Sequence, residues 1–116
     1  MSAEVKEIID FSDLGKIDIR VGTIEEVESV KDSKKLVKLI VDFGSFKRQI
    51  LVGMQGERDD PKEILGKQAL FVVNLAPKKM AGEMSEGMLF DIGYEDGITP
   101  VLAQPEKPVP AGTRAG

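Results

Sequence analysis

Apolar and polar residues alternate along three segments in the first half of the chain. In the first of them, Ile17, Ile19 and Val21 are separated by charged residues. A period of two residues is typical of a β-strand with one buried face, so we expect three strands. Gly22 interrupts the first strand, and a glycine inside a strand often marks a bulge or a sharp bend. The predicted strands cover residues 17–30, 37–43 and 46–54.

The second half of the chain predicts a short helix and two more strands. Asp60 followed by Pro61 is a helix start signal, because Asp caps the N-terminus and Pro suits the first helical position. Gly66 is placed to end that helix. Apolar runs then predict a fourth strand over residues 68–75 and a fifth over residues 88–93.

Three strands, a helix and two strands follow each other in the order of the OB-fold. This fold is a five-stranded Greek-key barrel with a helix between strands three and four. Another small β-barrel is the competing interpretation of the same pattern. We therefore predict one all-β domain, with an amphipathic N-terminal helix within residues 1–14, a barrel over 15–98 and a tail rich in Pro and Gly over 99–116.

Length and cysteine content restrict the class of protein. A chain of 116 residues suits a single domain with one core. No segment approaches the about 20 apolar residues that span a bilayer, and the acidic start MSAEVKEIID does not resemble a signal peptide. Cys is absent, which excludes disulfides and fits a reducing compartment. We expect a cytoplasmic protein that does not enter a membrane.

The absence of both His and Cys also argues against catalysis. These residues supply the usual general base near neutral pH, the best zinc ligands and the strongest nucleophile. We therefore expect no catalytic residue, no metal and no cofactor, and a protein that binds rather than reacts. An enzyme that uses carboxylates or lysines is the alternative that composition leaves open.

Charge is distributed unevenly, which matters more than the net charge of −4. Acidic residues gather within 4–13, 25–28 and 57–63, whereas basic residues gather in the predicted loops 29–35 and 76–85. An OB-fold binds oligonucleotides with these two loops and with the face of strands two and three. Any one lysine is explained by solvent exposure, but their joint placement favours contact with a phosphate backbone. The basic residues are Lys31, Lys34, Lys35, Lys78 and Lys79 in the loops, and Arg20, Lys47 and Arg48 on the strands.

Three blocks of the sequence carry a family resemblance. Residues 74–89 read NLAPKKMAGEMSEGML, residues 11–28 read FSDLGKIDIRVGTIEEVE, and residues 105–116 read PEKPVPAGTRAG. In this order they resemble the tRNA-binding domain found at the C-terminus of many methionyl-tRNA synthetases, in EMAP II-like cytokine precursors and in small free-standing tRNA-binding proteins. The resemblance implies an OB-fold that binds tRNA.

The resemblance also implies which residues contact tRNA. Chemistry alone would make Ser85 a turn cap and Met88 a core residue, but the matching Ser and Met of the family are implicated in tRNA contact. With the basic loop, the implied contacts are Lys78, Lys79, Ser85 and Met88, and the Glu86 carboxylate adds a hydrogen-bonding group.

Three departures from the family's usual pattern stand out. Ala81 stands where the family often has Arg, Ser33-Lys34-Lys35 where it often has Ala-Asp-Lys, and Val52-Gly53-Met54 where Ser often precedes Gly-Ile.

In the resembling free-standing proteins, the segment after the barrel mediates a two-fold dimer. We therefore expect a homodimer that binds tRNA by shape and backbone. It would act as a free-standing protein or as the C-terminal domain or beta subunit of methionyl-tRNA synthetase, its partner. The initial Met and the short helix favour a complete small protein, although a cloned fragment would look similar. The tail residues suited to the dimer are Val101, Leu102, Pro108, Val109 and Pro110.

A different function remains as the alternative. CsaA-type proteins, a branch of this family, resemble export chaperones that bind unfolded preproteins in an apolar groove at the dimer. The segment VDFG, residues 41–44, looks like that branch, and the acidic net charge is compatible with it. The SEGM block looks more like the tRNA-binding branch.

Overall fold

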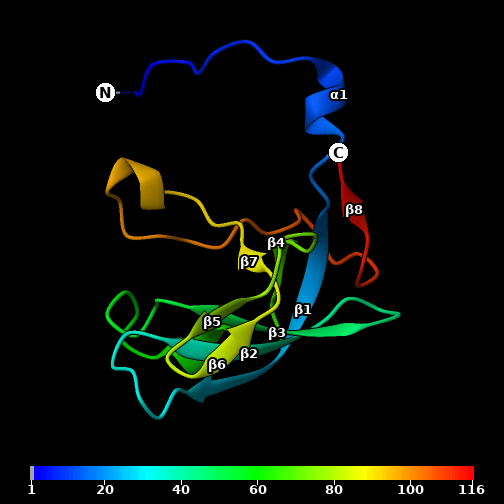
Figure 1. Ribbon diagram of the computed structural model, residues 1–116. Helices are drawn as coiled ribbons and strands as arrows, with labels where there is room; N and C mark the ends of the chain where they lie inside the picture. The colour runs from blue at the N-terminus through cyan, green and yellow to red at the C-terminus, as the bar shows by residue number, and fades with distance from the viewer. Residues whose placement is uncertain (1) are drawn as a thin grey trace.

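The computed structural model, which describes residues 2–116, is a curled antiparallel sheet that forms a nearly closed barrel (Figure 1). The strands follow the order β3-β2-β1-β4-β7, with β8 beside β1. The end strands β3 and β7 lie against each other, which brings the sheet close to closure. The bounds are Ile19–Ser29 for β1, Val37–Asp42 for β2, Lys47–Val52 for β3, Gln68–Val72 for β4, Met88–Leu89 for β7 and Arg114–Ala115 for β8.

The core follows directly from the alternation in the sequence. In β2, Val37, Leu39 and Val41 are buried, whereas the residues between them are only partly covered. Phe71 packs edge-on against Phe43, with ring centroids 5.6 Å apart. The all-β class and the five-strand order predicted from the sequence are therefore confirmed.

The predicted helix between strands three and four is a single 3-10 turn, η1, Pro61–Ile64. It begins as expected, because the Asp60 carboxylate accepts a hydrogen bond of 3.1 Å from the Lys62 amide. Ile64 is completely buried and fixes the turn against the barrel core.

The N-terminal helix is much shorter than the predicted span within residues 1–14. Only α1, Phe11–Leu14, is helical, and residues 2–10 have no regular secondary structure. The side chains of Val5 and Ile8 are 98% and 99% exposed. A short helix is marginal in water without a surface to pack on, and the barrel offers these residues none. Within residues 2–116 no helix has the length and apolarity to cross a membrane.

The last two predicted strands are also shorter than expected. β4 ends at Val72 rather than at residue 75, and β7 has only two residues. Beyond β7 the chain forms an isolated bridge between Ile92 and Val101 around a 3-10 turn, η2, Tyr94–Asp96. The predicted strand lengths followed the runs of apolar residues. Some of these apolar side chains remain on the surface outside the strands, as does Ile92 at 56% exposure.

Gly22 does not mark the bulge in β1. The register with β2 shifts between Ile24 and Glu26, two residues further on. Gly22 is needed for a different reason: a Cβ at this position would overlap Val41 Cγ1 and lie 2.7 Å from Phe43 Cε1. The bend of β1 therefore brings its backbone directly onto the core.

The C-terminal tail packs back onto the barrel. The Gln68 side-chain amide donates to the Val109 carbonyl at 2.7 Å and accepts from the Val109 amide at 3.1 Å, as a neighbouring strand would. Leu102 packs against the core cluster, whereas Val101 is 52% exposed. The tail thus belongs to the barrel and still leaves apolar surface uncovered.

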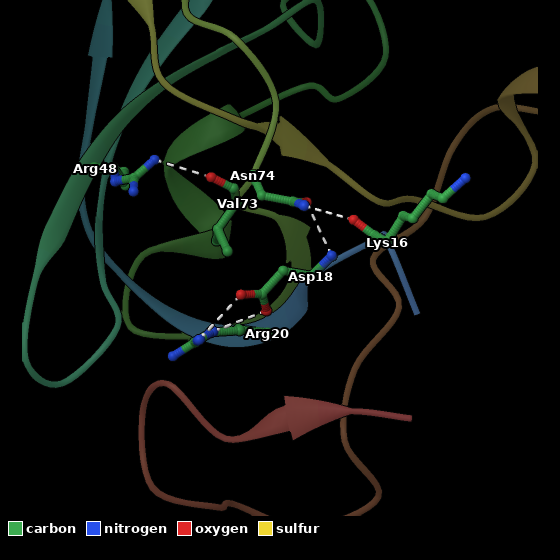
Figure 2. A network of polar contacts seen from close by, with 6 residues as sticks. All are labelled: Lys16, Asp18, Arg20, Arg48, Val73 and Asn74. Atoms are coloured by element: carbon green, nitrogen blue, oxygen red, sulfur yellow. Dashed lines mark hydrogen bonds and ion pairs between the residues drawn. The ribbon is translucent and has the colours of Figure 1, made fainter. Parts of the chain in front are cut away.

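A polar network joins the start of β1 to the end of β4 (Figure 2). The Asn74 side chain donates to the Lys16 carbonyl at 2.7 Å and accepts from the Asp18 amide at 2.8 Å. The Asp18 carboxylate accepts two hydrogen bonds from the Arg20 guanidinium, at 2.9 and 3.0 Å. These hydrogen bonds from Arg20 hold the pKa of Asp18 below its usual value.

Replacing Gly22 by Ala is expected to destabilise the fold by about 1–3 kcal/mol, the usual cost of overpacking a core. The matched control is Gly53→Ala, because a Cβ on Gly53 meets nothing within 4 Å. Urea denaturation of both variants measures the difference. Equal free energies of unfolding would contradict the packing described for β1.

The Asp18 ion pair predicts a pH dependence of stability. Because the folded-state pKa is lowered, the stabilisation is present above the unfolded pKa of about 3.9 and is lost as pH falls through the folded value. Asp18→Asn should lower the free energy of unfolding at pH 7 by roughly 0.5–1 kcal/mol, and the deficit should shrink below pH 4. The exposed Asp59→Asn is the control. A deficit that stays constant with pH would contradict this role for the carboxylate.

Candidate nucleic-acid interface

The second predicted loop, residues 76–85, folds as a hairpin. Its strands are β5, Lys78–Met80, and β6, Glu83–Ser85. Ala81 and Gly82 form the turn with φ angles of 49° and 83°. Positive φ at both central residues is the pattern of a type I′ turn, for which Asn-Gly is favoured. This hairpin was predicted as a loop because its short strands lack an alternating apolar face.

The hairpin lies over β2 and β3 (Figure 1). Gln49 of β3 donates from its side-chain Nε2 to the Met84 carbonyl at 3.0 Å. Lys38 Nζ, at the start of β2, lies 3.3 Å from Glu83 Oε2. These contacts place the two predicted binding loops on the same side of the barrel.

The lysines of the two loops have no acidic partner in the described part of the chain. Within residues 2–116, none of the five loop lysines has a carboxylate within 4 Å, and all five are exposed. The first loop is ordered by the Ser33 hydroxyl, which accepts from the Lys35 and Leu36 amides at 3.2 and 3.0 Å. The five residues are Lys31, Lys34, Lys35, Lys78 and Lys79.

On the face of β2 and β3, in contrast, the lysines are paired with acidic side chains. Lys38 lies between Glu28 and Glu83, and its pKa is raised chiefly by the hydrogen bond to Glu83. Lys47 is paired with Glu25 at 2.9 Å, which raises the pKa of Lys47. On β2 and β3 the charges of Lys38 and Lys47 are therefore balanced by acids, whereas Arg48 donates to backbone carbonyls.

Arg20 and Arg48 pack around Phe46 and bind groups of the barrel. Both guanidinium carbons lie near the Phe46 ring, at 5.8 and 4.9 Å from its centroid, within the distance of a cation–π interaction. Arg20 is bound to Asp18, and Arg48 Nη1 donates to the Val73 carbonyl at 3.0 Å (Figure 2). The Phe46 ring also stacks on Phe43, with centroids 5.2 Å apart. Both arginines are thus engaged in the fold, and Phe46 is only partly available to a base.

The SEGM block divides into buried and exposed parts. Ser85 is 4% exposed, and its hydroxyl accepts from the Leu51 amide at 3.0 Å. Glu86 is half-buried, and its Oε1 accepts from the Gln49 amide at 3.0 Å. Met88 is 45% exposed. Contact of Ser85 and Glu86 with RNA stays a prediction, whereas their bonds to β3 are observed.

The ion pairs on the strand face were not predicted from the sequence. Glu28 and Lys38 are register partners in β1 and β2, which counting from the predicted turn would have found. Glu83 reaches the same lysine only through the hairpin, for which the sequence gives no signal. Within residues 2–116, no three acidic side chains are grouped so that they could hold a metal ion.

Comparison with known proteins gives consistent results. The family described as "Putative tRNA binding domain" matches residues 19–114. A methionine–tRNA ligase of Methanococcoides burtonii is 44% identical over 109 residues, which cover 93% of this chain but only 16% of that enzyme. This chain thus spans about one sixth of such relatives.

Solved structures match nearly the whole chain. A MetRS-related protein from Pyrococcus horikoshii is 40% identical with a TM-score of 0.87, covering 96% of this chain and 100% of that one. The chaperone CsaA from Bacillus anthracis is 31% identical with a TM-score of 0.81, covering 95% and 100%. With a barrel of the expected topology and a family match over residues 19–114, the chain belongs to the tRNA-binding domain family.

Proposed function

We propose that this domain binds tRNA through its phosphate backbone, with the two lysine loops as the contact surface. The observation that carries the proposal is the joint position of five exposed, unpaired lysines on one side of the barrel. Lysine is a point charge that suits phosphate contact without reading the base sequence. The resemblance adds Arg20, Arg48, Glu86, Ser85 and Met88 to the proposed site.

The expected ligand is folded RNA rather than a single strand. Proteins that bind single strands stack successive bases on exposed aromatic rings. Phe46 is occupied by Phe43 and by two arginines, and Tyr94 lies in η2, beyond the barrel from the hairpin (Figure 1). Recognition by shape and backbone is the usual mode for structured RNA.

In the cell, we expect the domain to support aminoacylation without catalysing it. The relatives named as methionine–tRNA ligases carry this domain as a small part of their length. We propose that it serves as an appended domain or separate subunit of such a synthetase, or as a free-standing tRNA-binding protein. This role implies a cytoplasmic location and requires no cofactor.

We further propose a homodimer formed through the two termini. Phe11 is 88% exposed, and together with Val5 and Ile8 it gives the N-terminal segment an uncovered apolar surface. A groove between α1 and β8 is lined by Leu14 and Phe90 among others. Apolar patches of this kind mark association surfaces, and a two-fold dimer would double the lysine surface. We include in this dimer surface five residues of the tail: Val101, Leu102, Pro108, Val109 and Pro110.

The same groove supports a second candidate function. Solved structures of CsaA chaperones from two organisms share the fold of this chain. An unfolded preprotein would use the apolar groove rather than the lysine loops, and its binding would persist at high salt.

Replacing Lys78 and Lys79 together by Ala should weaken tRNA binding and flatten its dependence on salt. Each lost phosphate contact lowers the slope of log K against log salt by about 0.7–0.9, so the double variant should lose about 1.4–1.8. Fluorescence anisotropy with total tRNA over a salt series measures both quantities.

The control is Lys62→Ala with Lys67→Ala, which removes the same charge near η1, where we propose no contact. Slopes and affinities that are equal in the two double variants would show that the hairpin lysines do not touch phosphate. If the variant that lacks Lys78 and Lys79 also lost preprotein binding, the proposal that preproteins bind in the apolar groove would be contradicted.

Replacing Ile8 and Phe11 by Glu should convert the dimer into a monomer without changing the barrel. Charged side chains at these positions would have to be buried without partners. Sedimentation equilibrium gives the mass, and circular dichroism checks the fold. Glu4→Gln is the control. A wild-type protein that is monomeric at tens of micromolar would refute the proposal.

A further inference from the structure

The barrel has an unpaired strand edge that must be closed. In the sheet order, β3 and β7 are the two end strands, and they are not joined by a backbone ladder within residues 2–116. Gln49 and Leu51 direct their backbone groups away from β2 toward this edge. A buried backbone N–H without a partner is costly, so something other than a strand has to satisfy these groups.

Side chains of the SEGM block close the edge. The Leu51 amide donates to Ser85 Oγ at 3.0 Å, and the Gln49 amide donates to Glu86 Oε1 at 3.0 Å. In return the Glu86 amide donates to the Gln49 carbonyl at 2.8 Å. The Glu86 carbonyl accepts from Arg48 Nη1 at 3.0 Å. Two side-chain oxygens therefore take the place of strand carbonyls.

The Ser85 hydroxyl has little capacity left for a ligand. It accepts from Leu51 and donates its one hydrogen to the Gly87 carbonyl at 3.1 Å. Gly87 in turn has a φ of 150°, and a Cβ there would lie 2.8 Å from the Val72 carbonyl oxygen. Buried at 4% exposure, Ser85 would have to leave the edge before it touched RNA.

The closed edge is connected directly to the lysines. Ser85 is the register partner of Lys78 in the hairpin, and Met84 is the partner of Lys79. We infer that Ser85 and Glu86 are positioning residues: by fixing β6 to the edge of β3, they hold Lys78 and Lys79 where RNA is bound. This inference rests on the proposed tRNA-binding function, and it gives the two residues a role without direct contact.

A positioning role and a contact role predict different salt behaviour. If the hairpin is loosened, only the fraction of molecules with a docked hairpin binds, and the apparent Kd rises by the inverse of that fraction. The phosphate contacts of the docked state stay the same, so the salt slope does not change. Removing a phosphate contact lowers the slope instead.

The test combines hydrogen exchange with tRNA binding for Ser85→Ala. We expect exchange of the Leu51 amide to accelerate about tenfold, and the Kd for tRNA to rise about 3- to 10-fold with an unchanged salt slope. Ser45→Ala, in the exposed turn between β2 and β3, is the matched control and should change neither. Weaker binding without faster exchange, or faster exchange without weaker binding, would overturn the inference.

A second pair of variants keeps the test valid if Ser85→Ala does not fold. Glu86→Gln retains the oxygen that accepts from Gln49 and should keep near-normal affinity, whereas Glu86→Ala should weaken binding. Equal affinities for these two variants would overturn the inference.

A rescue experiment separates position from contact. Asn-Gly favours a type I′ turn, so Ala81→Asn should restore part of the affinity lost by Ser85→Ala. A direct RNA contact by Ser85 would not be restored, and no rescue would overturn the inference. If wild-type protein bound no tRNA, the proposed function itself would fail. If the Lys78 and Lys79 double variant lost binding while Ser85→Ala did not, only this inference would fail.

Discussion

Closure of the sheet at the edge of β3 is the constraint on which the other features of the site depend. A curled sheet whose end strands do not pair leaves N–H groups that water reaches poorly, and each unsatisfied group costs about 1–3 kcal/mol. Ser85 and Glu86 supply the missing acceptors from side chains. The same contacts fix the root of the hairpin and provide the carbonyl to which Arg48 binds. Barrel stability and the placement of the lysines therefore share one set of hydrogen bonds.

Pairing of charges explains how an acidic domain can present a site for an anion. The net charge is −4, yet Glu25, Glu28 and Glu83 beside the site are paired with strand lysines. Exposed charges interact over about 8–10 Å at physiological salt, so the local set of lysines matters more than the total. Glu28 and Glu83 hold Lys38 between them and so balance its positive charge on the strand face. The relatives include synthetases and chaperones, which agrees with the general finding that one fold carries several functions.

The sequence predicted the barrel because the alternation in β1, β2 and β3 is a direct consequence of burial on one face. It also predicted the start of η1, where Asp60 caps the turn by a local hydrogen bond. The N-terminal helix was overestimated because its spacing is helical but no surface of the barrel covers Val5 or Ile8. The hairpin and the closing bonds of Ser85 and Glu86 depend on contacts between residues 34 to 37 positions apart, which a local pattern does not encode.

The most direct test of the central claim is the binding of wild-type protein to total tRNA between about 50 and 200 mM salt, the range in which loss of phosphate contacts is readily measured. An unfolded peptide is added as competitor. Binding by the lysine loops predicts an affinity that falls steeply with salt and resists the peptide. Absence of tRNA binding at the lowest salt, with peptide binding intact, would contradict the account and favour the chaperone function.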